Sequence, residues 1–215
     1  MARRSTCAGS TRWDERLNGS RIRYIGDISR EDAALLARTA AGARRILEFG
    51  AGASTQVVAQ AAPEGTEIVT VETKAGWVDR TRENFRRLGI SREIRFVPYR
   101  GFWRAVEGPF ELIFDDGIDR LRADFAERAW PMLAVGGCML FHDMRRPRDA
   151  RVALRQVERV FLEVASVQLN PEGSNLTVVR KQAPQEYVDW NVAEGRARWE
   201  YGHADPPPGL WGDKQ

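Results

Sequence analysis

The sequence contains few cysteines and no long apolar segment. Cys7 and Cys138 are too few for a disulfide framework, and Cys138 lies in an apolar run where a reduced, buried thiol is expected. No stretch approaches the roughly 18 apolar residues that span a membrane, and no apolar segment follows the arginines of residues 1–18. We therefore expect a protein of a reducing, cytoplasmic compartment that is neither exported nor inserted in a membrane.

Lysine is also scarce, because nearly all of the positive charge is arginine. The 33 basic and 30 acidic residues give a formal net charge of +3, and the lysines are Lys74, Lys181 and Lys214. The arginines are spread along the whole chain, which indicates a composition bias rather than a nucleic-acid surface. With 215 residues, of which 43% are hydrophobic, the chain suits one core with short additions.

Strand-like and helix-like segments alternate from Ser29 onward. Ser29 with Asp32 three residues later is typical of a capping box, and it predicts a helix that ends before Gly42. The strand-like segments are residues 45–50, 67–72, 93–99, 110–114 and 137–141, and the helix-like segments between and after them are residues 51–62, 77–88, 120–133 and 148–160. This alternation predicts a parallel sheet with both faces covered by helices and right-handed crossovers.

The pattern changes after the last of these helices. Residues 161–169 and 175–180 are strand-like and flank a turn at residues 170–174, which predicts an antiparallel pair. The predicted fold is α/β: a Rossmann-like, doubly wound, mostly parallel sheet of seven strands with a C-terminal antiparallel hairpin. We divide the chain into a partly ordered N-terminal arm without a periodic pattern (1–28), this domain (29–181) and an aromatic, proline-containing appendage (182–215).

The turn after the first strand of the domain is rich in glycine. Ligands of open parallel sheets bind outside the carboxyl ends of the strands. Gly50 permits a sharp turn there, and Gly52 lets a ligand lie against bare backbone. Ser54 and Thr55 then cap the following helix or bind a ligand carboxylate near its amino end. Taken alone, the pattern is more typical of a simple glycine turn.

Two acidic residues near this turn indicate that it binds a ligand. Glu72 closes the next strand 22 residues after Gly50, close to the spacing of a carboxylate that accepts hydrogen bonds from ribose hydroxyls. Glu48 precedes the glycines, where its charge would repel a dinucleotide pyrophosphate but would attract an ammonium or sulfonium group. The pair favours a positively charged nucleoside ligand.

Four blocks in this order resemble the class I S-adenosylmethionine-dependent methyltransferases. They are residues 47–55, 69–72, 114–117 and 133–143, and the resemblance runs from about Ile28 to Arg180. The subgroup they resemble is the small-molecule O-methyltransferases. The residues that this resemblance assigns to the cofactor are Glu48, Gly50, Gly52, Ser54, Thr55, Glu72, Trp77 and Asp115.

The resemblance also implies where each part of S-adenosylmethionine lies. The glycines would pack against its methionine part, Glu48 would lie near its ammonium, and Ser54 and Thr55 near its carboxylate. Glu72 would hold the ribose. Trp77 would lie beside adenine or, alternatively, serve as an ordinary core aromatic. Residues 99–102 lack the acidic residue that many family members direct at the adenine amine.

A second set of polar residues follows the next two strands. Asp116 and the pair His142 and Asp143 lie at the ends of neighbouring strands, so they converge beside the methyl donor. Metal-dependent members of the resembling subgroup carry ligands at these turns, which implies that the three residues bind Mg²⁺ or Mn²⁺ and lower the pKa of a substrate hydroxyl. His142 and Asp143 share an ion only if the strand has already ended. A metal-free site with His142 as general base, and a structural histidine, remain alternatives.

The expected activity is O-methylation of a small hydroxylated metabolite. Arg145 and Arg146 are the candidates to recognise an anionic group of the substrate. One alternative is a catalytically silent cofactor-binding protein. The other is an NAD(P)-dependent oxidoreductase, which the lack of a third glycine and of a Tyr-x-x-x-Lys pair disfavours. The tail tryptophans are expected to dock on the parent domain, with closure over substrate or burial in a homodimer as alternatives.

Overall fold

The structure is a computed structural model, and it describes residues 11–17, 20–143, 165–169 and 171–181. The expected helix at residues 148–160, the expected substrate residues Arg145 and Arg146, and the appendage at 182–215 lie outside the described residues. Among the described residues, no helix has the length and apolar character that a membrane crossing requires.

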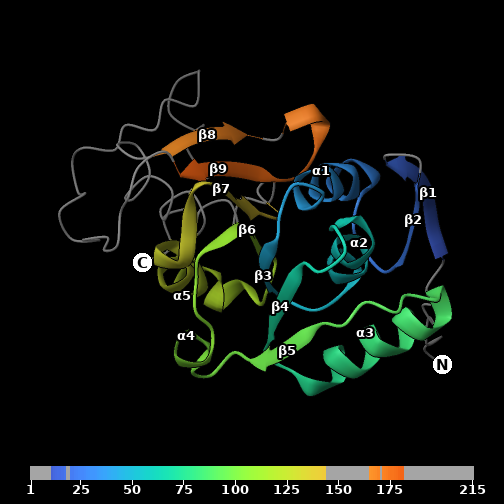
Figure 1. The fold of residues 1–215 in the computed structure, drawn as a ribbon, viewed down its shortest axis with the longest axis horizontal. Coiled ribbons are helices and arrows are strands. Elements are labelled where there is room, and N and C mark those ends of the chain that lie inside the picture. The colour runs from blue at the N-terminus through green and yellow to red at the C-terminus, as the bar shows by residue number, and fades with distance from the viewer. Residues whose placement is uncertain (1–10, 18–19, 144–164, 170, 182–215) are drawn as a thin grey trace, which may run out of the picture.

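Within the described residues, seven strands form one sheet in the order β5-β4-β3-β6-β7-β9-β8 (Figure 1). The strands are β3 (Arg45–Phe49), β4 (Glu67–Glu72), β5 (Arg95–Pro98), β6 (Phe110–Asp115), β7 (Leu133–Phe141), β8 (Ala165–Leu169) and β9 (Thr177–Lys181). β3 to β7 pair in parallel, whereas β9 runs antiparallel to both β7 and β8. The prediction of a mostly parallel Rossmann-like sheet with a terminal hairpin is confirmed.

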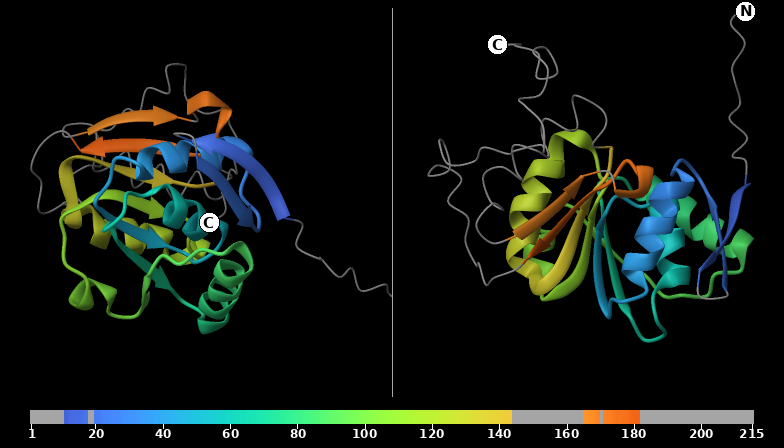
Figure 2. Two further views of the ribbon diagram at one scale, coloured as in Figure 1. Left: turned by 45° about the vertical axis from the view of Figure 1, so that its right-hand side comes forward. Right: turned by 90° about the horizontal axis from the view of Figure 1, so that it is seen from above.

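Helices cover both faces of this sheet, as the view from above in Figure 2 shows. They are α1 (Arg30–Ala40), α2 (Ala53–Ala61), α3 (Ala75–Leu88), α4 (Phe102–Ala105) and α5 (Asp119–Ala129), with short 3-10 turns η1 (Trp130–Met132) and η2 (Pro171–Gly173). Ile46 packs with α1 and α2 in one core, and Leu47 packs with α4 and α5 in the other. Consecutive residues of β3 thus serve opposite layers, as the pleat of a doubly covered strand requires.

Helix ends follow the signals in the sequence. The Ser29 hydroxyl accepts a hydrogen bond of 3.0 Å from the Asp32 backbone N–H and so caps α1. Gly89 ends α3 in the left-handed conformation, with φ of 70°. The prediction missed the short helix α4, and it extended the helix of residues 120–133 too far, because α5 ends at Ala129 and β7 begins at Leu133 rather than at residue 137.

The N-terminal arm contains a hairpin that the sequence pattern did not show. β1 (Thr11–Leu17) pairs antiparallel with β2 (Ser20–Ile25). The Gln56 side chain of α2 accepts a hydrogen bond of 2.8 Å from the Ile25 N–H and donates one of 3.0 Å to the Ile25 carbonyl. Gln60, one turn later, bonds the Arg23 backbone in the same way. Besides its pairing with β1, β2 is therefore held against α2 by side-chain amides of that helix. Strand periodicity in the sequence does not reveal such contacts.

Candidate active site

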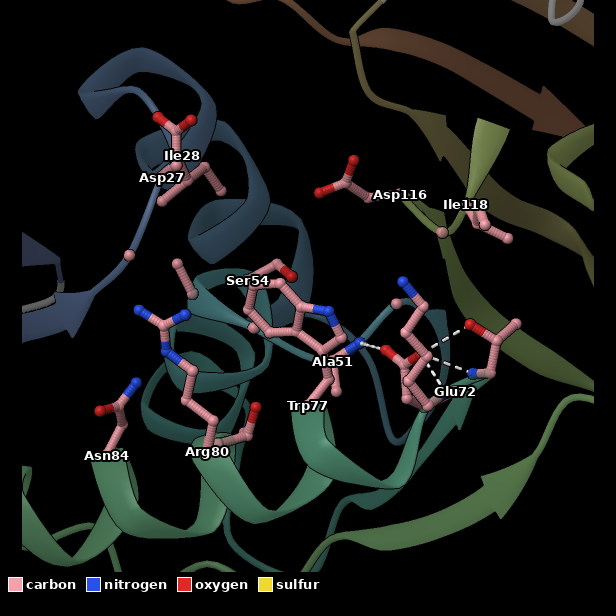
Figure 3. Close-up of a pocket in the computed structure, with 18 of the residues that line it drawn as sticks. Asp27, Ile28, Ala51, Ser54, Glu72, Trp77, Arg80, Asn84, Asp116 and Ile118 are labelled. Carbon is pink, nitrogen blue, oxygen red and sulfur yellow. Dashed lines mark hydrogen bonds between the residues drawn. The ribbon is translucent and has the colours of Figure 1, made fainter. Parts of the chain in front are cut away.

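A cavity of about 490 Å³ opens at the carboxyl ends of β3, β4 and β6 (Figure 3). Its walls are residues 50–54 of the glycine turn, Glu72 at the end of β4, the first half of α3, and residues 116–118 after β6. Residues 25–28, between β2 and α1, close the remaining side. This volume lies within the range of sites for small molecules and cofactors. The predicted edge of the sheet is therefore the one that carries a cavity.

Gly50 and Gly52 occupy different environments in the turn. Gly50 has φ of 97°, and a Cβ there would lie 2.5 Å from the Asp116 carbonyl oxygen, so only glycine fits. A Cβ on Gly52 would meet nothing within 4 Å. Gly50 thus brings the turn against the end of β6, while Gly52 leaves open space that faces the cavity.

Glu48 lies buried beneath this turn rather than in the cavity wall. Its carboxyl group accepts hydrogen bonds from the hydroxyls of Ser54 (2.6 Å), Thr55 (2.7 Å) and Thr70 (2.8 Å). Complete burial raises the pKa of Glu48 to about 7, although the three hydroxyl donors act to lower it. Ser54 and Thr55, expected near a ligand carboxylate, therefore direct their hydroxyls to Glu48, and of these three residues only Ser54 lines the cavity.

The Glu72 carboxylate is held in place by the backbone around it. Its Oε2 accepts a hydrogen bond of 2.9 Å from the Ala51 N–H, and its Oε1 accepts bonds from the N–H groups of Thr73 (2.5 Å) and Lys74 (2.8 Å). Because each carboxylate oxygen has two lone pairs, Oε2 retains one for a further donor. Glu72 thus lines the cavity with a fixed acceptor, as its proposed contact with ribose requires.

Trp77 lines the cavity with its indole 43% exposed, as Figure 3 shows. This exposure excludes the alternative of an ordinary core aromatic. The Arg80 guanidinium, one turn along α3, lies 5.2 Å from the Trp77 ring centroid and also lines the cavity. Sequence reasoning missed Arg80, although residues three apart on a helix share a face and the pair with Trp77 was a usable signal.

Asp116, His142 and Asp143 converge as the sequence predicted. His142 Nδ1 lies 3.1 Å from Asp116 Oδ1 and 3.4 Å from Asp143 Oδ1. The strand has ended at Phe141, and Asp143 has φ of 63°, so the alternation of faces no longer applies. The second ring nitrogen, Nε2, lies 3.2 Å from Oδ2 of Asp32 in α1. Asp32 was noticed in the sequence only as part of a helix cap.

A buried arginine from α5 completes this cluster. Arg122 Nη2 lies 3.0 Å from Asp116 Oδ1 and 3.5 Å from Asp143 Oδ2. The same guanidinium donates hydrogen bonds to the backbone carbonyls of Gly117 (2.8 Å) and His142 (2.9 Å). Nothing in the sequence distinguished Arg122 from the other arginines of its helix, because its role depends on the direction in which it enters the core.

The carboxylates around His142 decide its charge. Burial lowers the pKa of His142, but contacts with Asp116, Asp143 and Asp32 outweigh burial and raise it to about 12. Without a cation in the cluster the ring is therefore an imidazolium at neutral pH, and a cation at Nδ1 would have to displace the proton there, because only neutral imidazole binds a metal. Because an imidazolium has no free lone pair, this arrangement does not support the metal-free alternative in which His142 is the general base.

Asp115 was predicted to bind the cofactor, but its position does not favour that role. Its side chain is fully buried, does not line the cavity, and finds no hydrogen-bond partner for either oxygen among the described residues. Burial raises its pKa well above the ordinary value, although the nearby Arg122 guanidinium acts to lower it. Its position at the end of β6 gives no support to contact with the cofactor.

Comparisons with known proteins agree with this arrangement. Residues 47–144 match the family model of a methyltransferase domain, a span that includes the glycine turn, Glu72 and the Asp116–His142–Asp143 cluster. No curated protein matches the chain. The strand order and the match of residues 47–144 to a methyltransferase domain show that this chain has the Rossmann-like fold of methyltransferases.

Solved structures with the same fold include several methyltransferases. A methyltransferase of Podospora anserina, bound to S-adenosylhomocysteine, is 21% identical over 72% of this chain and 80% of its own, with a TM-score of 0.60. An O-methyltransferase of Bacillus cereus in complex with S-adenosylhomocysteine is 21% identical over 72% and 83%, with a TM-score of 0.59. The O-methyltransferase TomG of Streptomyces achromogenes in complex with S-adenosylmethionine is 17% identical over 73% and 82%, with a TM-score of 0.60.

Proposed function

We propose that this protein transfers the methyl group of S-adenosylmethionine to an oxygen atom of a small hydroxylated metabolite. The observation that carries the proposal is the position of Asp116, which lines the cofactor cavity and also belongs to the buried cluster with His142 and Asp143. A methyl donor and an acceptor hydroxyl would meet at this residue. The proteins from B. cereus and S. achromogenes, described as O-methyltransferases, share the fold and support the same reaction class.

The cavity contacts support a placement for the cofactor. Gly52 offers open backbone to the methionine part, Glu72 Oε2 accepts from a ribose hydroxyl, and Trp77 lies beside adenine. Glu48 acts from beneath, by fixing the turn through its three hydroxyl donors. Since two of those hydroxyls belong to Ser54 and Thr55, another group must bind the cofactor carboxylate.

We assign the cofactor carboxylate to Arg80. Its guanidinium points into the cavity in Figure 3, and within the described part of the chain no carboxylate pairs with it. A guanidinium binds a carboxylate through two parallel hydrogen bonds, which suits the free amino-acid end of the cofactor. The N-terminus of α2, which lines the same cavity, adds a favourable field for an anion.

The cluster at the acceptor end has the donor set of a divalent-cation site. One donor atom from each of Asp116, His142 and Asp143 lies within 4.8 Å of the others, and among the described residues the buried Nδ1 of His142 has only ion-pair contacts, with no well-aligned hydrogen bond. Asp116, His142 and Asp143 would hold such a cation through two carboxylates and one neutral imidazole nitrogen. A bound Mg²⁺ or Mn²⁺ supplies Lewis-acid activation of the acceptor hydroxyl.

In the proposed reaction, Asp116 and Arg122 have different roles. Asp116 points over the cavity in Figure 3 and receives the proton of the acceptor hydroxyl as the oxygen attacks the methyl carbon. Arg122 holds Asp116 and Asp143 through its guanidinium. The bond from methyl carbon to sulfonium sulfur breaks in line with the bond that forms to oxygen, and neutral S-adenosylhomocysteine leaves.

The test is release of S-adenosylhomocysteine from S-adenosylmethionine over a panel of catechols, phenols and sugars, with and without a chelator. We expect product with at least one acceptor and loss of turnover when the chelator is added. Cofactor binding without product for any acceptor would favour a catalytically silent binding protein. If the chelator leaves turnover unchanged, the proposed cation plays no part in the reaction, while the proposed methyl transfer still stands.

A further inference from the structure

Asp32 is a buried carboxylate that none of the roles above requires. It lies in the first turn of α1, with 2% of its surface exposed, and the Ser29 cap fixes its backbone. Both of its oxygens are engaged: Oδ2 lies 3.2 Å from His142 Nε2, and Oδ1 accepts a hydrogen bond of 2.5 Å from the Asn175 N–H. A charged group buried this completely is costly unless its partners are fixed.

Asn175 links this carboxylate to the rest of the cluster. Its backbone N–H donates to Asp32, while its side-chain Nδ2 donates a hydrogen bond of 3.1 Å to Asp143 Oδ1. Asn175 precedes β9, so the hairpin that follows the parallel strands reaches back to the ends of α1 and β7. Asp32, His142, Asp143 and Asn175 thus form a closed ring of contacts drawn from distant parts of the chain.

The consequence for His142 is geometric. An imidazole has two nitrogens, and the partner of one nitrogen sets the direction of the other. With Nε2 bound to Asp32, Nδ1 faces Asp116 and Asp143. A rotation of the ring by half a turn would present a carbon atom to those carboxylates instead. Histidines that bind metals commonly have a carboxylate behind the second nitrogen for this reason.

We propose that Asp32 is a positioning residue of the methyltransferase site, which holds His142 so that Nδ1 is presented to the space shared with Asp116 and Asp143. This inference rests on the proposed function, because the orientation of His142 matters only if the cluster with Asp116 and Asp143 takes part in methyl transfer. Asp32 contacts neither the cavity nor the reacting atoms. It acts only through the imidazole.

Asp32→Asn tests the proposal with little change in size. The amide offers one acceptor oxygen where the carboxylate offers two, but both neighbours, the Asn175 N–H and the His142 Nε2–H, are donors. The backbone N–H is fixed by the hairpin, so the imidazole is the partner that loses its acceptor. Glu31→Gln is the matched control, because it removes the same charge from the same helix turn at an exposed position.

The first readout is the Nε2 proton of His142 in ¹⁵N-histidine NMR spectra. The chain has two histidines, so His203→Gln assigns the signal. In the wild-type protein we expect this proton to be protected from exchange with water, and in Asp32→Asn we expect its exchange to be faster by at least about tenfold. Free exchange in the wild type, or full protection in Asp32→Asn, would overturn the proposal. The wild-type measurement decides the matter even if the variant does not fold.

The second readout is Mn²⁺ affinity, measured by electron paramagnetic resonance without any acceptor. We expect Asp32→Asn to weaken Mn²⁺ binding by about 10- to 100-fold, whereas Glu31→Gln leaves it unchanged. The affinity for S-adenosylmethionine should stay within about twofold in both variants, since Asp32 lies outside the cavity. Unchanged Mn²⁺ affinity in Asp32→Asn would contradict the proposal. If the wild type binds no Mn²⁺, the cation part of the proposed function fails, and the proton signal alone decides the role of Asp32.

Discussion

Ser54 donates a hydrogen bond of 2.6 Å to Glu48 across the glycine turn, so the hydroxyl and the carboxyl expected to grip two ends of a ligand hold each other instead. The pair ties the first turn of α2 to the end of β3. Gly50 and Gly52 are thereby kept at the edge of the cavity, where the proposed cofactor would meet backbone rather than side chains. Recognition of its charged end would then depend on the opposite wall, which α3 supplies.

Gly52→Asp should weaken cofactor binding and leave the fold intact. A Cβ at this position meets nothing within 4 Å, so the structure accommodates the side chain, but this side chain would fill the open space against which the methionine part of the cofactor is proposed to pack. Loss of that space should reduce the affinity by at least about tenfold. Calorimetric titration with S-adenosylmethionine checks this, and a thermal melt checks the fold.

Gly76→Asp is the control for this substitution. A Cβ on Gly76 also meets nothing within 4 Å, and Gly76 does not line the cavity. It should bind S-adenosylmethionine as the wild type does. Equal affinities for all three proteins would mean that the cofactor does not pass over the glycine turn.

Arg80→Gln should weaken binding of S-adenosylhomocysteine by about tenfold, because a charge-assisted pair with the amino-acid carboxylate is lost. 5′-Methylthioadenosine lacks that carboxylate, so its affinity should not change. Arg87→Gln, on the same helix at an exposed position, is the control. The assignment of Arg80 is wrong if the substitution weakens both ligands equally, since that result would point to Trp77 and adenine rather than to the carboxylate.

The parts of this site that the sequence predicts are those that depend on the sheet. Strands that run in parallel end at one edge, so Asp116 and His142 had to converge once the alternation was recognised. Asp32 and Arg122 enter from helices, and the direction in which a helical side chain reaches the core depends on how the helix packs. The sequence leaves both a cofactor contact and a core position open for Trp77 for the same reason. The hydroxyl of Ser54 can rotate toward different acceptors. It donates to Glu48 because Glu48 is buried beside it, and the sequence does not show that burial.

His142→Ala should reduce turnover by about 100-fold or more while the cofactor affinity changes by less than about twofold. The imidazole belongs to the proposed acceptor end of the site and does not line the cavity proposed for the cofactor. The measurement is the rate of S-adenosylhomocysteine release beside a calorimetric titration with S-adenosylmethionine. An unaffected rate would assign His142 a structural role, as an ion-pair partner of the surrounding carboxylates.

Glu48→Gln should make the protein less sensitive to pH. In the wild type the pKa of Glu48 is raised from 4.5 to about 7, chiefly by burial, so the folded state keeps a proton that the unfolded state releases. A raised pKa of this kind means that stability is fully present below pH 4.5 and is lost as the pH rises to about 7. The loss amounts to about 3 kcal/mol of unfolding free energy, which the neutral glutamine does not suffer. Urea unfolding at pH 5 and pH 7.5 measures the difference, with Glu64→Gln, an exposed acid, as the control. If Glu48→Gln and the wild type lose stability in parallel over this range, Glu48 is ionised in the folded protein and its three hydroxyl donors outweigh its burial.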